Sequence, residues 1–532
     1  MSLSSFAAPF FPEIVLLAGV LLIFLLDVLR VRRIELVGGI AVVATLFALA
    51  SVVADLGFAP LAFLATIPSA QIDALPAVGA APLYTFTSLG LVFQAIFLLA
   101  AFFVALASTS RPSDERGAPI FYGLLLLATL GMLLVAIASD LIFLLLAIEV
   151  VSIASYLLVA YTRRDVRGLE AAMKFFIIGA LSTVLSFFGA SLLFGAYGTT
   201  NLFLIRDAGT AVGYPILVLL GYAFLFAGLA FKLTLVPFHA WAVDVYDGAP
   251  NDVSAFLAGG TKKIGIFAFF LVFLGPVLAV DAVGQSGYGL FGGSVALGPS
   301  FQLALGAIAV LTMTLGNVLA LLQKEMKRML AYSSISQAGY MLIGIAIGTA
   351  PALGGATLQV FAHALMKTGA FLVVAAVAAL GVGPLIEDWR GLGLRRPFLG
   401  TSFALMLLSL AGVPLTVGFV SKFVLFSAAV QAQGWFIWLA VAGLLNSALS
   451  VFYYARVLKV MYFDSSPAPD PALAGAVMGG AGPPALALGG LGYGRAVTIG
   501  LIAAMILVLG IYPQPVLGAI QSAAYHFVAL GA

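Results

Sequence analysis

Six ionisable side chains lie inside stretches of the chain that are otherwise apolar, and their types suit proton chemistry. They are Glu149, Lys232, Lys262, Lys263, Lys367 and Lys422. A charge at the centre of a membrane helix costs about 2.5 to 3.5 kcal/mol on insertion scales, so six would cost on the order of 15 to 20 kcal/mol. Helix packing gives no reason to accept that cost, whereas buried acids and bases in membranes commonly carry protons. The pattern therefore predicts a proton relay.

Glu149 and Lys232 are predicted to act together. Glu149, within IFLLLAIEVVSIASYLLVAY, can accept a proton and pair with a buried lysine; a structural ion pair is the alternative. Lys232 has no acid one turn away on its own segment, so its partner must come from another helix. The alternative for Lys232 is that its long side chain reaches the membrane surface, because Pro237 follows five residues later.

Two further pairs of basic residues have informative spacing. Lys262 and Lys263 are adjacent, so on a helix their side chains point about 100° apart, and one can serve as a relay while the other pairs elsewhere. His363 and Lys367 are four residues apart and share a helix face. A neutral histidine beside a lysine suits a proton path, and a packing histidine is the alternative.

Metal and thiol chemistry are not indicated. The chain has no cysteine, which excludes disulfides, thiolate metal sites, iron–sulfur clusters and cysteine nucleophiles. The three histidines are far apart in sequence, so a histidine-rich metal site is not expected. Of the other two histidines, His239 is either a relay residue or a helix cap, and His526 has no predicted role. No metal ligand and no bound cofactor are predicted.

Composition excludes a soluble fold. The 532 residues are 63% hydrophobic and 8% charged, and their mean hydropathy is +1.18. Soluble chains are about a quarter charged and less than half apolar. The net charge of +3, with no basic tail, also gives no reason to expect a nucleic-acid partner. An all-α membrane protein that crosses the bilayer many times is the predicted fold class.

The apolar runs predict about 14 transmembrane helices. Their ranges are 12–29, 34–54, 84–109, 118–138, 140–161, 169–197, 213–237, 253–279, 301–322, 328–349, 353–383, 398–427, 433–461 and 496–513. The tail 514–532 is shorter and is not counted as a span.

The positive charges orient these spans. Eighteen of the 24 lysines and arginines fall at the loops after spans 1, 3, 5, 9, 11 and 13, whereas only Arg206 falls on the other side. Cytoplasmic loops carry such an excess, so both termini are predicted to face outward. The loop after span 7 belongs to the cytoplasmic set but carries Asp244, Asp247 and Asp252 and no lysine or arginine, which indicates a specialised loop.

Proline interrupts two spans that also contain lysine. Pro237 follows Lys232 in span 7, and Pro414 precedes Lys422 in span 12. Proline breaks a helix and frees carbonyls. Two broken helices five spans apart suggest inverted five-helix repeats, spans 4–8 and 9–13. The predicted divisions are 1–110 with three N-terminal spans, 118–279 and 301–461 with the repeats, and 462–532 with a loop and the last span.

Five segments resemble, in family order, the antiporter-like subunits of proton-pumping NADH–quinone oxidoreductase, respiratory complex I. They are IEVVSIASYLLVAYTRRDVRGLEAAMKFFIIGA, AFKLTLVPFHAWAVDVYDGAP, VSAFLAGGTKKIGIF, KRMLAYSSISQAGYMLIG and GVPLTVGFVSKFVLF. The chain is most similar to the N subunit, the counterpart of mitochondrial subunit 2 and the chloroplast B subunit. The M subunit typically has glutamate where this chain has Lys422, and the L subunit continues into a long lateral helix.

The resemblance implies roles for particular residues. Glu149 resembles the family's span 5 glutamate, Lys232 its span 7 lysine, Lys262 the central lysine of span 8, and Lys422 the span 12 lysine near the proton exit. Lys263 is additional to the usual single lysine. The segment HALMKTGAF, with His363 and Lys367, looks more like the L and M subunits or cation antiporters.

The resemblance also implies partners and a setting. The chain would be a non-redox translocase subunit in the inner membrane of a bacterium, beside M, L, K, J, A and H type membrane subunits and a hydrophilic redox arm. NADH, FMN, iron–sulfur clusters and quinone would belong to those partners. Quinone reduction there would shift the Glu149–Lys232 pair and drive protons outward. A subunit of a Mrp-type Na⁺/H⁺ antiporter is the alternative, and a solute transporter would need more polar groups at a midplane site.

Overall fold

The computed structural model describes residues 8–74, 81–110, 117–161, 166–208, 214–282, 298–464 and 491–531, and this part of the chain is helical apart from loops and three isolated β-bridges. The first half contains α2 (Phe11–Val28), α3 (Ile34–Asp55), α4 (Ser88–Ser108), α5 (Ala118–Ile137), α6 (Leu141–Ala160), α7 (Val166–Tyr197), α8 (Leu202–Ala208), α9 (Pro215–Leu233), α10 (Ala240–Gly248), α11 (Asn251–Phe256) and α12 (Lys263–Ala282). The second half contains α13 (Gly298–Leu322), α14 (Met326–Ile347), α15 (Ala350–Ala379), α16 (Leu392–Arg395), α17 (Pro397–Ala411), α18 (Val417–Gln431), α19 (Ile437–Tyr462), α21 (Tyr493–Ile511) and α22 (Gln514–Gly531).

The predicted membrane spans are confirmed as helices. Thirteen helices of the described residues are long and apolar enough to cross a membrane, and the shorter apolar helices α17 and α18 together fill the predicted twelfth span. Some of the charges used for orientation, including Arg163 and Arg164, lie outside the described residues. So does 465–490, most of the loop in the last predicted division.

Both predicted helix breaks are present. Helix α9 ends at Leu233, where Thr234 adopts a left-handed conformation with φ of 60°, and α10 begins only at Ala240. Helix α17 ends at Ala411, where Gly412 has φ of 92°, and α18 begins after Thr416, whose hydroxyl accepts from a backbone N–H at the new helix start. The break leaves the last carbonyls of each first half without partners in the helix, so side chains can use them.

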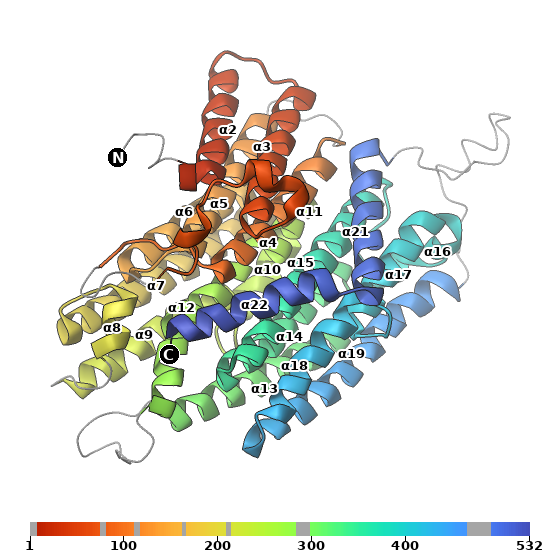
Figure 1. The fold of residues 1–532 in the computed structure, drawn as a ribbon. Helices are drawn as coiled ribbons and strands as arrows, with labels where there is room; N and C mark the ends of the chain where they lie inside the picture. The colour runs from red at the N-terminus through yellow and green to blue at the C-terminus, as the bar shows by residue number, and fades with distance from the viewer. Residues whose placement is uncertain are drawn as a thin grey trace, which may run out of the picture.

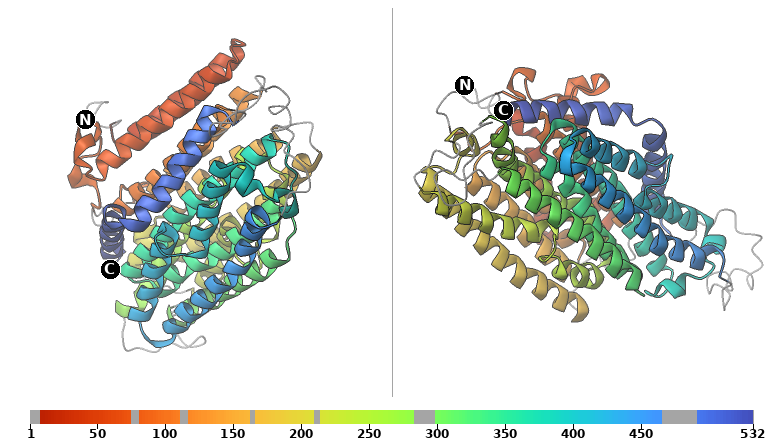
Figure 2. Two further views of the ribbon diagram at one scale, coloured as in Figure 1. Left: turned by 90° about the vertical axis from the view of Figure 1, so that its right-hand side faces the viewer. Right: turned by 90° about the horizontal axis from the view of Figure 1, so that it is seen from below.

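The helices form one bundle in which α12, α14 and α15 lie in the middle (Figures 1 and 2). Helices α6, α7 and α9 form one flank, and α17 to α19 form the other (Figure 1). Burial follows this order. The most apolar window of 251–274 is 94% buried and that of α15 is fully buried, whereas those of α7 and α19 are 33% buried. Polar residues of 251–274 and α15 therefore face protein and not lipid.

The tail 514–532 forms α22, which runs across the bundle at a steep angle to α21 (Figure 1). Two contacts fasten it. His526 Nδ1 lies 3.2 Å from Asp73 Oδ2, and Arg206 donates a hydrogen bond to the Leu530 carbonyl. Asp73 and Arg206 both belong to the face that the charge pattern places outside. Helix α22 thus covers that face instead of adding a span.

Candidate functional site

Glu149 and Lys232 are linked through hydroxyl groups on the α6–α7–α9 flank. Lys232 Nζ donates to Ser152 Oγ on α6 at 2.5 Å, and Ser152 Oγ lies 3.5 Å from Glu149 Oε1. Thr183 Oγ1 of α7 donates to the same carboxylate oxygen at 2.5 Å. Among the described residues, the ion pairs within 4.0 Å do not include Glu149 with Lys232. A hydrogen-bonded path through Ser152 therefore connects the two groups. Sequence reasoning had not identified Ser152.

A glycine allows these helices to approach so closely. Gly228 lies one turn before Lys232 on α9, and a methyl group there would overlap Ser186 on α7. Ser182 Oγ donates to the Gly228 carbonyl at 2.7 Å, which fixes α7 against α9. Both Glu149 and Lys232 are only half-buried. This flank joins an acid and a base near the edge of the bundle.

Lys262 and Lys263 contact different helices, as their adjacent positions predicted. Lys262 Nζ donates to the Ser334 carbonyl of α14 at 2.7 Å. Lys263 Nζ lies 2.5 Å from His363 Nδ1 of α15 and donates to the Ala258 carbonyl at 2.7 Å. The two lysines are 4% and 1% exposed, because neighbouring helices surround this segment on every side.

A π-helical turn, η4 (Leu257–Thr261), precedes the two lysines. The Lys262 N–H donates to the Leu257 carbonyl five residues earlier, at 3.2 Å. Such turns are rare and occur frequently at functional sites. Gly259 lies in this turn directly against Thr368 of α15, where a side chain would collide. The turn therefore sets the direction of the lysines and admits α15 at close range.

His363 and Lys367 meet the same stretch of α14, so the prediction of a shared face is confirmed. Lys367 Nζ donates to the Leu330 carbonyl at 2.8 Å and to the Ser333 hydroxyl. His363 Nε2 lies 3.4 Å from Ser334 Oγ. His363 and Lys367 are fully buried. Together with Lys262 and Lys263 they form the central cluster.

Lys422 is held by the second helix break. Its Nζ donates to the carbonyls of Leu410 at 2.9 Å and Ala411 at 3.0 Å, and to Ser447 Oγ at 2.8 Å. The first two are end-of-helix carbonyls that the break leaves available. The ring of Tyr340 lies 5.0 Å from the ammonium, within range of a cation–π contact. Lys422 is 4% exposed.

A pair of glutamines that sequence reasoning missed lies between the central cluster and Lys422. Gln359 Nε2 of α15 donates to Gln337 Oε1 of α14 at 2.6 Å, and Ser421 Oγ of α18 donates to Gln359 Oε1 at 2.6 Å. The sequence prediction used only the ionisable residues inside the spans. Helix spacing could have indicated the glutamines, since Gln337 lies one turn after Ser334 and Gln359 lies one turn before His363.

Another missed residue is Glu13, two positions into α2. It is 5% exposed, and Gln94 Nε2 of α4 donates to Glu13 Oε1 at 2.8 Å. Its place near a span end hid it from a search of span centres. The two remaining histidines do not join the central cluster through any hydrogen bond of the described residues. His239 occupies the first position before α10 without a side-chain cap, and His526 contacts Asp73.

The prediction of a loop for the three acids after span 7 is wrong, because the chain becomes helical again after the break at Thr234. Asp244 and Asp247 lie in α10 and Asp252 lies in α11, and cations of other helices neutralise them. Asp244 Oδ2 lies 3.0 Å from Lys174 Nζ, and Asp244 Oδ1 lies 3.1 Å from Arg328 Nη1. Asp252 lies 3.5 Å from Arg495 in a pair that is about 95% buried. Partial burial acts to raise the pKa of Asp244, but the hydrogen bonds and charges of Lys174 and Arg328 outweigh it and hold that pKa below its usual value. These acids thus form ion pairs that hold neighbouring helices together.

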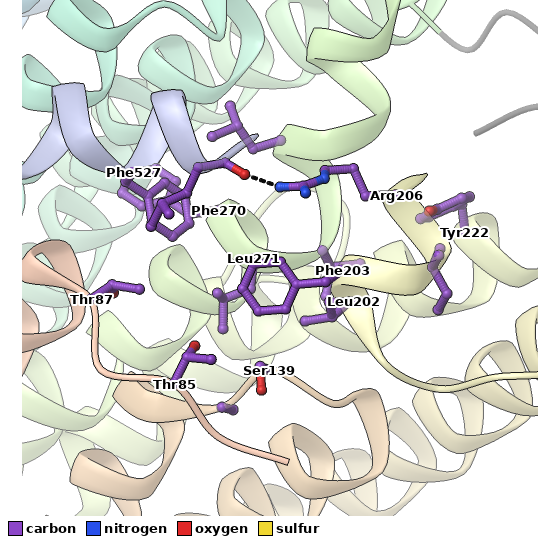
Figure 3. Close-up of a pocket in the computed structure, with 15 residues that line it drawn as sticks. Thr85, Thr87, Ser139, Leu202, Phe203, Arg206, Tyr222, Phe270, Leu271 and Phe527 are labelled. Atoms are coloured by element: carbon purple, nitrogen blue, oxygen red, sulfur yellow. Dashed lines mark hydrogen bonds between the residues drawn. The ribbon is translucent and has the colours of Figure 1, made fainter. Parts of the chain in front are cut away.

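A cavity of about 90 Å³ lies apart from the lysines, among α8, α12 and α22 (Figure 3). Leu202, Phe203 and Phe270 line it with Arg206, which holds the end of α22 at its rim. The central cluster and Lys422 do not line this cavity. Within the described residues, no group of three or more histidine, aspartate or glutamate side chains is arranged to hold a metal ion.

The chain is similar in sequence to one known family of membrane proteins. The family described as NADH:quinone oxidoreductase/Mrp antiporter, TM, matches residues 138–450. F(420)H(2) dehydrogenase subunit N of Methanosarcina mazei is 43% identical over 381 residues, covering 70% of this chain and 73% of that protein. NADH-quinone oxidoreductase subunit N 2 of Sorangium cellulosum is 35% identical, covering 89% and 92%.

A solved structure has the same fold. A chain of respiratory complex I from Thermus thermophilus with bound aureothin superposes with a TM-score of 0.72 at 29% identity, covering 96% of this chain and 99% of that one. The matched residues 138–450 include both helix breaks, the central cluster and Lys422. The chain belongs to the NADH:quinone oxidoreductase/Mrp antiporter family of membrane proteins, and within it to the subunit N group that NADH-quinone oxidoreductase and F(420)H(2) dehydrogenase share.

Proposed function

We propose that this chain carries protons outward across the membrane, driven by quinone reduction in partner subunits. The path runs from the Glu149–Lys232 flank through the central cluster to Lys422. One observation carries the proposal: four bases are buried together on the most buried helices of the bundle. Lys263 is hydrogen-bonded to His363, and Lys262 and Lys367 donate to neighbouring carbonyls of α14. Burying several bases together brings no packing advantage, whereas buried ionisable groups in membranes commonly serve proton transfer.

The geometry suits a relay that responds to charge. A lysine can alternate between ammonium and amine when its surroundings change, whereas arginine stays charged. A change in charge at Glu149 reaches Lys232 through Ser152, and a change at Lys232 alters the field at the next lysines along the bundle. The central lysine then gives its proton toward Lys422, which releases it outward. Each transfer needs a proton to leave one lysine nitrogen and reach the next lysine or, at the exit, the water outside.

Lys262 is the proposed central relay, and Lys263 supports it through His363. Lys262 contacts α14 beside Ser334, one turn from Gln337 on the way to Lys422. Lys263 is engaged with His363 and the Ala258 carbonyl. Lys262→Ala should therefore abolish pumping in reconstituted vesicles, and Lys262→Arg should also impair it. A more severe loss in Lys263→Ala than in Lys262→Ala would exchange the two roles.

The setting follows from the family and the charge pattern. Both termini face outward from the inner membrane of a bacterium, and 118–279 and 301–461 are the two inverted repeats. The partners are membrane subunits of the M, L, K, J, A and H types and a hydrophilic arm. Those partners hold FMN, iron–sulfur clusters and quinone, and accept electrons from NADH. Labelling of introduced cysteines in intact cells tests the orientation.

An ion antiporter subunit of the Mrp type is the second candidate, favoured by the His363–Lys367 segment and by the breadth of the matched family. Mass spectrometry of the subunits that co-purify with a tagged chain separates the two. Quinone-reductase subunits, with proton movement that depends on quinone reduction and not on Na⁺, support the proposal. Small antiporter subunits, with Na⁺-dependent proton movement that needs no electron donor, overturn it.

A further inference from the structure

Two buried amides lie between the central cluster and Lys422. Ser421 donates to Gln359, Gln359 donates to Gln337, and Gln337 Nε2 donates to the Leu410 carbonyl at 3.4 Å. Gln359 and Ser421 are fully buried and Gln337 is 1% exposed. This hydrogen-bond chain joins α14, α15 and α18, and it connects positions one helical turn from Ser334 and His363 with the Leu410 carbonyl that Lys422 also binds.

Amides form hydrogen bonds but do not carry protons. A glutamine side chain has two N–H donors and a carbonyl acceptor, and neither atom gains or loses a proton near neutral pH. A proton therefore cannot pass along the Gln337–Gln359 pair while the two amides touch each other. It can pass beside them only if water enters, because water can both accept and release a proton.

The Leu410 carbonyl connects this amide pair to Lys422. Lys422 as an ammonium has three N–H donors, and it has three partners: the Leu410 and Ala411 carbonyls and Ser447 Oγ. As a neutral amine it has only two donors, so one acceptor must be released. Gln337 Nε2 already donates a long hydrogen bond of 3.4 Å to the same Leu410 carbonyl, and it can draw closer when Lys422 releases that acceptor. The charge of Lys422 thus determines whether Gln337 shares the Leu410 carbonyl or holds it alone.

We propose that Gln337 and Gln359 form a gate that separates the central cluster from Lys422 and opens when Lys422 has lost its proton. This inference rests on the proposed outward proton path. After Lys422 releases its proton, Gln337 moves toward the Leu410 carbonyl and its contact with Gln359 loosens. Water enters, Lys262 gives a proton to the water and becomes an amine, and the Lys422 amine takes a proton from the water. The restored ammonium reclaims Leu410, and the gate closes before the proton can return.

Two substitutions at Gln359 should have opposite effects. Gln359→Leu keeps the volume and repels water, so pumped protons per electron should fall at least fivefold while passive proton conductance stays at the wild-type level. Gln359→Ala makes room for water, so passive conductance should rise severalfold. The pH gradient should then collapse faster after turnover stops. Gln337→Leu and Gln337→Ala should reproduce this pair of results.

The measurement uses the assembled complex in proteoliposomes, with assembly checked by subunit content. Gln323→Leu is the matched control, because Gln323 lies just beyond the end of α13 and its side chain donates to the Leu319 carbonyl of the same helix segment. It should pump and leak as the wild type does. If the leucine and alanine variants lose pumping equally without any difference in leak, the glutamines only support the structure and the gate is wrong.

Lys422→Met separates failure of the gate from failure of the proton path. If Lys422→Met abolishes pumping and the glutamine variants behave as expected, both proposals stand. If Lys422→Met abolishes pumping but all four glutamine variants pump and leak normally, the gate is refuted and the path stands. If Lys422→Met pumps normally, the path itself is refuted, and the gate that rests on it is refuted with it.

Discussion

Both broken helices carry a lysine near the break, but the two lysines have different partners. In the first, Lys232 lies before the break, on the half-buried flank, and its partner Ser152 leads to the carboxylate of Glu149. In the second, Lys422 lies after the break, is almost fully buried, and binds the uncharged carbonyls of the helix end. A lysine linked to an acid responds to the charge of that acid. The proton affinity of a lysine bound by carbonyls depends on which carbonyl dipoles and water molecules contact it.

This difference suggests a division of labour along the bundle. In the proposed path, a change in charge enters at the first break, near the edge of the bundle, and a proton is held at the second until it is released. The central cluster between them has bases but no carboxylate among its described hydrogen-bond partners. We therefore expect proton affinity in the cluster to depend on the charge that the flank presents.

The largest expected effect is at Lys422, the lysine held without an acid. Lys422→Met should reduce proton pumping at least tenfold, because among the described residues no other ionisable side chain donates to the Leu410 and Ala411 carbonyls. Lys422→Arg should be nearly as harmful, since arginine does not release its proton. The measurement is acidification by the assembled complex in vesicles during quinone reduction. Normal pumping by the arginine variant would show that Lys422 acts only as a fixed charge.

A second prediction tests whether Glu149 and Lys232 form one switch. Glu149→Gln and Lys232→Met should each suppress pumping severalfold, and the double variant should lose much less than the product of the two factors, because the second change removes a charge that already has no partner. The measurement is a double-mutant cycle on pumping and on quinone-linked turnover in variants that assemble normally.

Ser152→Ala sharpens the same test. It removes the bridge and leaves both charged groups, so it should weaken the coupling between Glu149 and Lys232 in the cycle. Ser447→Ala is the matched control at the second break, where Lys422 keeps its two carbonyl partners. Losses at Glu149 and Lys232 that simply multiply would mean that the two residues work independently.

The sequence predicts the spans and breaks well because each has a local cause. Long apolar runs form helices in a membrane because a helix satisfies its own backbone polar groups. Pro237 and Pro414 lie just after the ends of α9 and α17, where proline favours the end of a helix. Ionisable residues inside spans are visible for the same reason. The bridge at Ser152 and the amide pair of Gln337 and Gln359 are different, because which polar side chains meet depends on helix rotation and packing. Serine and glutamine cost little in a span, so their presence alone does not mark a site.

The π-helical turn before Lys262 was also beyond prediction. Its extra residue changes the direction of both lysines, and the letters LAGGT alone allow an ordinary helical turn as readily. The need for glycine at Gly259 follows from the close approach of Thr368, which is a tertiary contact. The ties of Asp244 and Asp252 to other helices are of the same kind. The sequence marked that segment as unusual without showing which helices supply the cations.

A third prediction compares the backbone at the two breaks. Gly412 has φ of 92°, and an added methyl group would lie 3.1 Å from Lys422 Cδ. Gly412→Ala should therefore destabilise the protein by about 1 to 2 kcal/mol and lower pumping by displacing Lys422. Thr234, at the first break, already adopts φ of 60° with a side chain. Thr234→Gly should be neutral or slightly stabilising in thermal unfolding in detergent, and a larger loss there than at Gly412 would contradict the comparison.

The smallest expected effect concerns charges outside the spans, where pairing ties helices together without serving the relay. Asp244→Asn should lower the thermal unfolding midpoint slightly at neutral pH and leave pumping unchanged. Because the folded-state pKa of Asp244 is below its usual value, its contribution to stability is complete above that usual value, which is about 3.9. The contribution is lost as the pH falls through the lowered pKa, so the wild type and the variant should converge in acid.

Glu170→Gln is the control, since that carboxylate contacts the same Lys174 but is 63% exposed. It should change the midpoint even less, because exposed ion pairs contribute little. A loss of pumping in Asp244→Asn at normal stability would mean that the charged segment takes part in proton transfer, and the separation between structural and relay charges would have to be withdrawn.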